Sequence, residues 1–312
     1  MSKEVPQSGL EGIIVAHYGV AVDVLFPENN EKYMVRVKRD SGHVVGDRVM
    51  VEGEVLSRLP RTSELSRMDA RRGVHLVGAN LDVLGIVVSC EPLPPPGFID
   101  RAMVAARAAG LTPILVMNKA DLACFAGYHA ATAPLYEEST QIFTVSATSG
   151  EGLKGVAGYF SEGHRGAFIG PTGVGKSSIL NSLLPDLNLQ VGAISESKKR
   201  GRHTTTVSTL HSLKNGGELI DSPGFNDFGL INVSTSELAA YFPGFEKAGR
   251  NTCRFRDCTH QSEPGCKVTE LLHNHQIREE RYTTYLQILA EVEAILTQPN
   301  YRERRHRRKK KG

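Results

Sequence analysis

Residues 170–178 read Gly-Pro-Thr-Gly-Val-Gly-Lys-Ser-Ser, which is the spacing of a phosphate-binding P-loop. The backbone N–H groups of such a loop curl around a phosphate chain, while Lys176 would reach the outer phosphates and Ser177 would bind Mg²⁺. Apolar residues 167–169 predict a strand before the loop, and residues 178–184 predict a helix after it, so the phosphates would lie at a helix N-terminus. The nucleotide contacts expected from the loop are Gly170, Pro171, Thr172, Gly173, Val174, Gly175, Lys176, Ser177 and Ser178.

The composition is that of an ordinary soluble protein that is longer than one compact core. The chain has 312 residues, 40% of them hydrophobic, which predicts two or three domains. The start has no apolar leader, and no run of about 18 apolar residues follows. We therefore expect a cytoplasmic protein without a membrane segment.

Basic residues are concentrated at the C-terminal end. Residues 301–312 hold eight Lys or Arg residues and one Glu, whereas the rest of the chain has 29 basic and 33 acidic residues, a net charge of −4. Such a run repels itself, so we expect a disordered arm that neutralises the phosphates of a nucleic acid. The alternative is a solvated tail that only aids solubility.

The N-terminal residues predict a small β-barrel. From about Gly12 to Val55, short alternating runs are separated by turn residues every eight to twelve positions. This pattern favours an OB-type barrel, which commonly grips oligonucleotides, although the few aromatic residues also allow a barrel used for protein contacts. The arginine-rich segment from Arg58 to Arg72 is expected to be a loop.

From Gly73 onward the pattern changes to buried strands that alternate with helices. The apolar runs at 80–88, 113–117 and 141–145 are typical of strands buried on both faces of a parallel sheet. Residues 98–109 between the first two runs predict a helix. We expect a doubly wound α/β sheet whose ligand lies beyond the carboxyl ends of its strands.

Two of these strands end in residues that fit a guanine base. The second strand runs into Asn118, Lys119 and Asp121, and the third runs into Ser146 and Ala147. The Asp121 carboxylate can accept hydrogen bonds from N1–H and the 2-amino group of guanine, whereas adenine has no 2-amino donor. The Asn118 amide would bond the base edge, and the Lys119 stem would cover the base plane. With a P-loop on the same sheet, these residues predict a GTP site.

The residues after the P-loop helix supply candidates for Mg²⁺ and the γ-phosphate. Residues 200–206 form a polar, glycine-containing loop of a kind that can order around a γ-phosphate, and a hairpin is predicted over 209–220. It leads to Asp221, which fits the acidic residue that holds Mg²⁺ through water. The Gly224 N–H can bond the γ-phosphate.

A cluster of cysteines beside histidine predicts a structural zinc site, because three thiolates and an imidazole can close a tetrahedron and leave no open position for catalysis. The residues, at intervals of five, two and six positions, are Cys253, Cys258, His260 and Cys266. His273 and His275 are rivals to His260, and reduced thiols in an irregular loop are the alternative to a metal. Cys90 and Cys124 are expected to be isolated. The amphipathic residues 276–297 predict a helix packed on the zinc loop.

The order of these motifs resembles the circularly permuted ribosome-assembly GTPases of the RsgA (YjeQ/YloQ) family. In Ras-like GTPases the P-loop comes first, whereas here residues 118–121 precede residues 170–178. The His-Thr-Thr sequence at 203–205 and the cysteine-rich segment 253–266 match the family as well, so the resemblance covers nearly the whole chain. It favours His260 as the zinc ligand.

The resemblance implies a multidomain fold with an N-terminal OB barrel, a central α/β P-loop GTPase of permuted motif order and a C-terminal helical zinc domain. We assign the barrel and arginine-rich linker to residues 1–72, the GTPase to 73–240, the zinc domain to 241–300 and the basic tail to 301–312. The implied ligands are GTP, Mg²⁺ and one Zn²⁺.

The resemblance also implies a partner and a reaction. The partner is the small (30S) ribosomal subunit with its rRNA, bound late in maturation by a monomer that binds no membrane. GTP would be hydrolysed to GDP and phosphate, with stimulation by the subunit. The alternatives are a GTPase acting in large-subunit assembly or tRNA modification, and a GTP-dependent RNA-binding module.

Hydrolysis needs a water that is oriented in line with the γ-phosphate. Ras-like enzymes use a glutamine after the glycine of their Asp-Xaa-Xaa-Gly motif, but this chain has Phe225, whose ring cannot orient water. The resemblance points to His203 instead, since one imidazole nitrogen can accept from water. Lys176 and the Gly224 N–H would stabilise the phosphoryl charge.

The expected magnesium ligands come from three segments. Ser177 and Thr205 would bind the ion directly, and Asp221 would bind it through water. Thr204 is the alternative to Thr205 and a further expected nucleotide contact.

Overall fold

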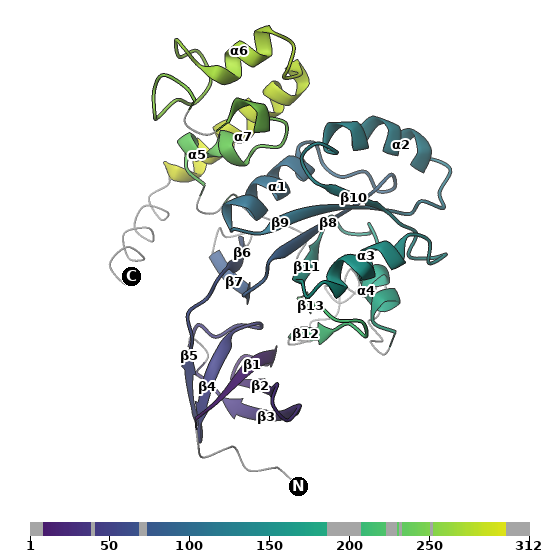
Figure 1. Cartoon of the computed structure of the whole chain (residues 1–312), viewed down its shortest axis with the longest axis vertical. Helices are drawn as coiled ribbons and strands as arrows, with labels where there is room; N and C mark the ends of the chain where they lie inside the picture. The colour runs from purple at the N-terminus through teal and green to yellow at the C-terminus, as the bar shows by residue number, and fades with distance from the viewer. Residues whose placement is uncertain are drawn as a thin grey trace, which may run out of the picture.

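The computed structural model describes residues 9–38, 41–68, 74–185, 207–222, 230, 233–249 and 252–297. Figure 1 shows an all-β part at the N-terminal end, an α/β part in the middle and a helical part at the C-terminal end. This arrangement confirms the predicted fold class, while the predicted domain boundaries stay predictions. The basic tail 301–312 lies outside the described residues.

The N-terminal part is built from antiparallel strands in the order β3-β2-β1-β4-β5, and the OB-type barrel stays a prediction. Their side chains alternate, so one face forms a core that includes Ile14, Val24, Phe26 and Val49. The strands are β1 (Leu10–His17), β2 (Ala21–Phe26), β3 (Glu31–Arg36), β4 (Arg48–Glu52) and β5 (Val55–Arg58).

The segment after the barrel is not the simple loop predicted for Arg58 to Arg72. Strand β6 (Glu64–Met68) pairs antiparallel with β7 (Val74–Ala79). Leu65 is 2% exposed and packs in the core of the α/β part, which anchors the hairpin although the surrounding sequence is polar. The polar composition of this segment therefore predicts a loop wrongly, because backbone pairing and the burial of one leucine hold β6 as a strand.

Arg61 holds the end of the barrel to the hairpin. Its Nε lies 2.6 Å from the fully buried Asp47 Oδ1, and its Nη1 lies 2.9 Å from Glu64 Oε1. A buried carboxylate without a partner would be costly, so this arginine has a structural task in the described structure.

The central sheet confirms the predicted doubly wound α/β architecture. Its strand order is β10-β9-β8-β11-β13-β12, with parallel pairing except between β12 and β13. Every residue of β8 is buried, as its apolar run predicts. The strands are β8 (Val83–Ser89), β9 (Thr112–Asn118), β10 (Gln141–Thr144), β11 (Arg165–Ile169), β12 (Ser208–Ser212) and β13 (Glu218–Asp221).

Helices cover both faces of this sheet (Figure 1). Met103 of α1 and Leu115 of β9 belong to the core on one face, and Phe160 of α3 and Ile179 of α4 belong to the core on the other. The helices are α1 (Phe98–Ala108), α2 (Phe125–Thr132), which continues into the short η1 (Ala133–Leu135), α3 (Leu153–Ser161) and α4 (Lys176–Leu183).

The barrel and the central sheet are joined through their backbones. Strand β1 pairs antiparallel with β12, with His17 opposite Ser208 and Ala16 opposite Thr209. The barrel therefore lies against the strand that directly follows the predicted 200–206 loop.

The C-terminal part is a helical layer with an aromatic core of Phe242, Phe245 and Tyr285. Helix α7 begins at Glu279, three residues later than predicted, and the Tyr285 hydroxyl donates to Thr259 O at 2.9 Å. The predicted packing of this helix on the cysteine loop is therefore confirmed. The elements are α5 (Thr235–Tyr241), η3 (Glu246–Ala248), α6 (Lys267–His273) and α7 (Glu279–Leu296).

Ion pairs connect α1 of the central part to α7 of the C-terminal part. Arg281 Nη1 lies 2.6 Å from Asp100 Oδ1, and both side chains are less than a tenth exposed. Arg101 Nε donates to Glu291 Oε2 at 2.7 Å, about three turns of α7 further along. No helix among the described residues combines the length and the apolar character needed to cross a membrane.

Candidate functional site

The P-loop has the predicted strand, loop and helix context. Strand β11 ends at Ile169, and α4 begins at Lys176 after a loop with left-handed φ angles of 87° at Gly173 and 97° at Gly175. A Cβ on Gly175 would lie 2.2 Å from Asn118 Nδ2, so only glycine fits there. The expected phosphate contacts are therefore brought together on one loop and the first turn of one helix.

The Lys176 ammonium lies inside this loop. Its Nζ donates to Gly170 O at 2.6 Å and to Pro171 O at 3.0 Å. Burial lowers the pKa of Lys176 to about 8, because desolvation disfavours the charged form. A phosphate chain in the loop would favour the charged ammonium.

Asn118 connects the P-loop to the turn after β10. Its Nδ2 donates to Val174 O at 2.8 Å, and its Oδ1 accepts from Ala147 N at 3.1 Å. Asn118 is 2% exposed at the end of β9. The expected bond to the base edge would use the second N–H of this amide, so Asn118 has a bridging task that sequence reasoning did not include.

The other predicted base residues surround the same point. Ser146 Oγ donates to Asp121 Oδ1 at 2.5 Å, which fixes one oxygen of the exposed carboxylate. Lys119 adopts a left-handed φ of 66°, and its Nζ donates to Glu91 O at 2.6 Å. The structure thus gathers Asn118, Lys119, Asp121, Ser146 and Ala147 beside the P-loop, as the carboxyl ends of neighbouring parallel strands require.

Asp221 ends β13, the parallel neighbour of the strand that leads into the P-loop. Burial raises the pKa of its carboxyl group. Asp221 therefore lies at the same edge of the sheet as the P-loop, because β11 and β13 are parallel neighbours. His203, Thr204, Thr205, Gly224 and Phe225 lie outside the described residues.

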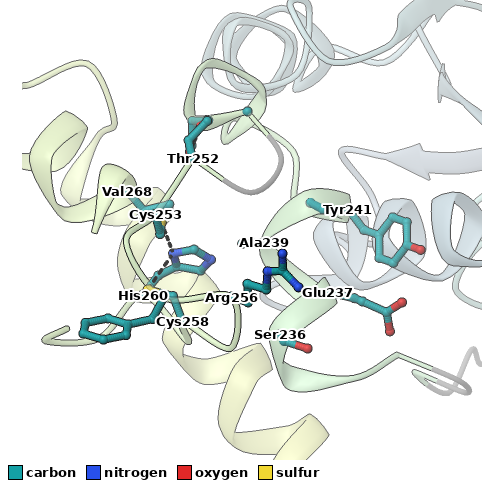
Figure 2. Close-up of a pocket in the computed structure, with 14 residues that line it drawn as sticks. Ser236, Glu237, Ala239, Tyr241, Thr252, Cys253, Arg256, Cys258, His260 and Val268 are labelled. Atoms are coloured by element: carbon teal, nitrogen blue, oxygen red, sulfur yellow. Dashed lines mark hydrogen bonds between the residues drawn. The ribbon is translucent and has the colours of Figure 1, made fainter. Parts of the chain in front are cut away.

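The cysteine cluster has the spacing of a closed zinc site, and Figure 2 shows three of its four side chains, Cys253, Cys258 and His260. His260 Nδ1 lies 3.5 Å from Cys253 Sγ, 3.5 Å from Cys258 Sγ and 3.3 Å from Cys266 Sγ. A tetrahedron with Zn–S of about 2.3 Å and Zn–N of about 2.1 Å has edges of about 3.6 to 3.8 Å. The side chains therefore fit Zn²⁺, since all the donor atoms lie within 4.8 Å of one another.

Within the part of the chain that the structure describes, His260 joins the cysteines, and its rivals do not. His273 Nδ1 lies 2.6 Å from Thr269 O, and His275 belongs to no cluster of metal-binding side chains. The structure therefore agrees with His260 and not with His273 or His275.

Glu263 organises the cysteine loop, a task that sequence reasoning missed. Burial opposes its charge, but hydrogen bonds from Thr259 N at 2.6 Å, Thr259 Oγ1 at 2.7 Å and Gln261 N at 2.8 Å lower the pKa of this carboxyl group to about 2. A lone acid inside a loop whose N–H groups need acceptors is the signal that could have identified it. On the other side of the loop, the Tyr282 hydroxyl donates to His260 O at 2.7 Å.

A cavity of about 220 Å³ adjoins the cysteine cluster (Figure 2). It lies between α5 and the cysteine loop, and its lining includes Glu237, Tyr241, Arg256 and His260. Its polar lining includes side chains of both charges.

Cys90 and Cys124 are not isolated, which corrects the sequence-based expectation. They form a disulfide across 34 positions, with Cα atoms 6.0 Å apart. Cys90 directly follows β8 and Cys124 directly precedes α2, so the adjacency of β8 and β9 brings them together. Sequence spacing alone does not reveal such a pairing.

A P-loop beside a base-binding segment that precedes it in the chain defines a P-loop GTPase of circularly permuted motif order. Residues 58–231, more than half of the chain, match the family model described as RsgA GTPase. The chain belongs to the RsgA GTPase family, and it is accordingly a GTP hydrolase.

Curated relatives agree with this family over most of the chain. The small ribosomal subunit biogenesis GTPase RsgA of Pseudomonas syringae pv. syringae (strain B728a) is 38% identical over 294 residues, covering 90% of this chain and 85% of the relative. The protein of that name from Azotobacter vinelandii (strain DJ / ATCC BAA-1303) is 39% identical and covers 93% of this chain and 87% of the relative.

Solved structures agree as well. The crystal structure of YjeQ from Thermotoga maritima aligns with a TM-score of 0.73 and 29% identity, covering 91% of this chain and 99% of that protein. YloQ, described as a circularly permuted GTPase, aligns with a TM-score of 0.68 and 23% identity over 92% of this chain and 96% of its own length. The second likeness supports the fold alone.

Proposed function

We propose that this chain binds the small ribosomal subunit through its rRNA, late in maturation, and hydrolyses GTP to GDP and phosphate there, with stimulation by the subunit. The observation that carries the proposal is the Asn118 bridge between a base-binding segment and a P-loop, in a chain similar along most of its length to small ribosomal subunit biogenesis GTPases. The protein would act in the cytoplasm as a monomer.

The proposed nucleotide site follows from the described geometry. Guanine would be bound by Asp121, with Asn118 at the base edge and Lys119 over the base plane. Ser146 supports this role for Asp121, because its hydroxyl uses one acceptor site on one carboxylate oxygen and leaves acceptor sites on both oxygens for the two guanine donors. The phosphates would lie along residues 170–178, next to the buried Lys176 ammonium.

The proposed magnesium ligands are Ser177, Thr205 and, through water, Asp221, with Thr204 as the alternative to Thr205. Mg²⁺ prefers oxygen ligands and keeps several waters, which suits a carboxylate that acts through water. The ion would neutralise charge on the β- and γ-phosphates. Lys176 and the Gly224 N–H would stabilise the phosphoryl oxygens, and His203 would orient the attacking water.

The pairing of β1 with β12 supports stimulation by a bound partner. Because β12 begins at Ser208, five residues after His203, a subunit bound to the barrel would act directly next to the catalytic loop. We infer that contact with the subunit positions His203 for hydrolysis through a disorder-to-order transition of its loop.

The cysteine cluster supports a structural task for the C-terminal part. A Zn²⁺ ion held by Cys253, Cys258, His260 and Cys266 would leave no position for a reacting water. The ion would instead fix the loop on α7, since Tyr282 and Tyr285 already donate to its backbone. The loop would then present a rigid surface to rRNA.

The test is GTP turnover against added small subunits over a salt series. We expect turnover to rise with small subunits, and the rise to weaken steeply with salt, because phosphate contacts release counterions. Isolated large subunits and tRNA are the controls. Equal stimulation by either would favour an alternative GTPase function, and GTP-dependent subunit binding without faster turnover would indicate a GTP-dependent RNA-binding module.

A His203→Ala variant tests the catalytic assignment separately. We expect it to bind GTP and the subunit but to lose the stimulated turnover by about 100-fold or more, the range for an oriented general base or water-positioning group. Stimulated turnover equal to that of the unmodified chain would remove His203 from the mechanism.

A further inference from the structure

We propose that the Cys90–Cys124 disulfide is a reversible redox clamp on the guanine site, which slows nucleotide release when oxidised and permits faster release when reduced. The proposal rests on the GTP site proposed above and adds a means of regulation to it. Its basis is that the disulfide joins two segments, residues 89–92 and 118–124, and both segments contact the loops proposed to bind the nucleotide.

The first segment lies between the base residues and the P-loop. Lys119 Nζ donates to Glu91 O at 2.6 Å, and Ser89 Oγ donates to Pro92 O at 3.1 Å. A Cβ placed on Gly173 of the P-loop would lie 3.5 Å from the Pro92 ring. A displacement of Cys90 would therefore change the positions of Lys119 and of the P-loop, because both contact residues 91 and 92.

The second segment carries the guanine-reading carboxylate. Cys124 follows Asp121 by three residues, and the turn is closed by Leu122 N donating to Lys119 O at 3.0 Å and Phe125 N donating to Leu122 O at 3.0 Å. Because the turn is short and internally bonded, fixing Cys124 also restricts where Asp121 can move. The disulfide thus reduces the freedom of Lys119 and Asp121 together, which is a form of preorganisation.

The two cysteines differ in exposure, and we infer from this that an external thiolate reaches Cys124 first. Cys124 is exposed, whereas Cys90 is 8% exposed. A small thiolate can therefore attack Cys124 Sγ, forming a mixed disulfide and releasing Cys90 as a thiolate; a second thiolate then displaces Cys124. The products are two protein thiols and one small-molecule disulfide.

Oxidation follows the same path in reverse, with a low-molecular-weight disulfide such as glutathione disulfide as oxidant. The Cys124 thiolate attacks it and releases one glutathione thiolate, and the Cys90 thiolate then attacks Cys124 Sγ and releases the second. Two electrons pass from the cysteines to glutathione disulfide, and the two thiol protons end on the two glutathione molecules.

The remaining cysteines allow a clean control. The chain has five cysteines, and the other three, Cys253, Cys258 and Cys266, are the free thiols of the proposed zinc cluster. A Cys124→Ser variant removes the clamp and keeps that cluster. Any effect of oxidant on the cluster would therefore persist in the variant.

The experiment measures release of fluorescent methylanthraniloyl-GDP from the full, zinc-loaded chain, in dithiothreitol and in glutathione disulfide. Peptide mapping under non-reducing conditions verifies the state of the pair. We expect release to be about tenfold faster from the reduced chain, as loss of preorganisation predicts. Cys124→Ser, and Cys124→Ala as a second variant, should release at the reduced rate in both buffers.

Equal release from the two verified states would overturn the clamp while leaving the GTP site intact. The same redox response in Cys124→Ser would also overturn it, because the effect would then arise at the zinc cluster. Failure of glutathione disulfide to join Cys90 to Cys124 would do so as well. Absence of methylanthraniloyl-GDP binding in both states would instead remove the GTP site on which the clamp depends.

Discussion

The side-chain amide of Asn118 donates a hydrogen bond to the backbone carbonyl of Val174, at 2.8 Å and across 56 positions of the chain. This bond joins the end of β9 to the P-loop, although the chain reaches β9 first. The permuted order therefore leaves the contact between base-binding segment and phosphate loop intact. Positions in space, and not order along the chain, determine the site.

Replacing Asn118 by Asp should misplace the P-loop. The change removes the donor to Val174 O and places a carboxylate oxygen against that carbonyl oxygen, so neither of these two oxygens receives a hydrogen bond from the other, although the second carboxylate oxygen can still accept from Ala147 N. We expect affinity for methylanthraniloyl-GDP to fall at least about tenfold in a fluorescence titration. The matched control is Asn274→Asp at the exposed end of α6, which should bind like the unmodified chain. Equal affinities in the two variants would contradict the bridging role.

The Lys176 ammonium makes nucleotide affinity depend on pH. Its pKa is lowered to about 8 by burial, and bound phosphates would raise it again. Below pH 8 the lysine is already charged, so affinity is at its full value. Above pH 8 binding must take up a proton, so affinity should fall by up to about tenfold per pH unit.

A titration with GDP between about pH 7 and pH 9 measures this dependence. A Lys176→Arg variant stays charged throughout, so its affinity should be flatter with pH even if it is weaker overall. The same variant is also the control for titration of the nucleotide, because protonation of the GDP phosphates affects both proteins alike. Parallel pH profiles for the two proteins would argue against a titrating lysine.

Glu263 should control how firmly the cysteine cluster retains zinc. A Glu263→Gln change keeps the size of the side chain but removes the charged acceptor for the loop N–H groups of Thr259 and Gln261. We expect zinc to be retained about 10- to 100-fold less tightly, measured by transfer to a chromophoric chelator. Glu293→Gln on the exposed side of α7 is the control, and equal transfer from both variants would refute the effect.

The buried pair between Arg281 and Asp100 should matter more for stability than an exposed pair. In the unmodified chain, desolvation raises the pKa of the buried Asp100 carboxyl group, and Arg281 partly opposes this rise. Arg281→Met removes that partner and leaves the carboxyl group buried. We expect the free energy of unfolding in urea to fall by about 3 to 5 kcal/mol. The double change with Asp100→Asn should recover part of the loss.

The control for this pair is Lys247→Met, which breaks an exposed contact with Glu138. Its expected cost is below about 1 kcal/mol, because solvent screens exposed pairs. Similar losses of unfolding free energy in Arg281→Met and Lys247→Met would contradict the expectation that the buried pair contributes more to stability than the exposed pair.

The sequence predicts the strand, loop and helix around residues 170–178 because the P-loop motif encodes local geometry. The P-loop spacing requires a particular backbone path, and apolar runs that end in Asn118 and Ser146 place those residues at one edge of a parallel sheet. The cysteine spacing likewise predicts a metal-binding cluster, and of the histidines that the structure describes, His260 is the one that lies against the sulfurs.

Features formed between distant backbone segments are not predictable in this way. The pairing of β1 with β12 uses main-chain groups that every residue carries, so no side-chain pattern marks it. The pairing of Cys90 with Cys124 depends on which strands are neighbours. Strand β6 lies within the segment Arg58 to Arg72, whose polar composition predicts a loop and gives no sign that Leu65 is buried.

Asp121 is proposed to read a guanine base beside a P-loop that follows it in the chain. The most direct test compares the affinities of GTP, ATP and xanthosine triphosphate for the unmodified chain and for Asp121→Asn. We expect the unmodified chain to prefer GTP and the variant to prefer xanthosine triphosphate, because an amide can donate to its 2-oxo group. A chain that binds ATP as tightly as GTP, or a variant that keeps its preference for GTP, would contradict this expectation.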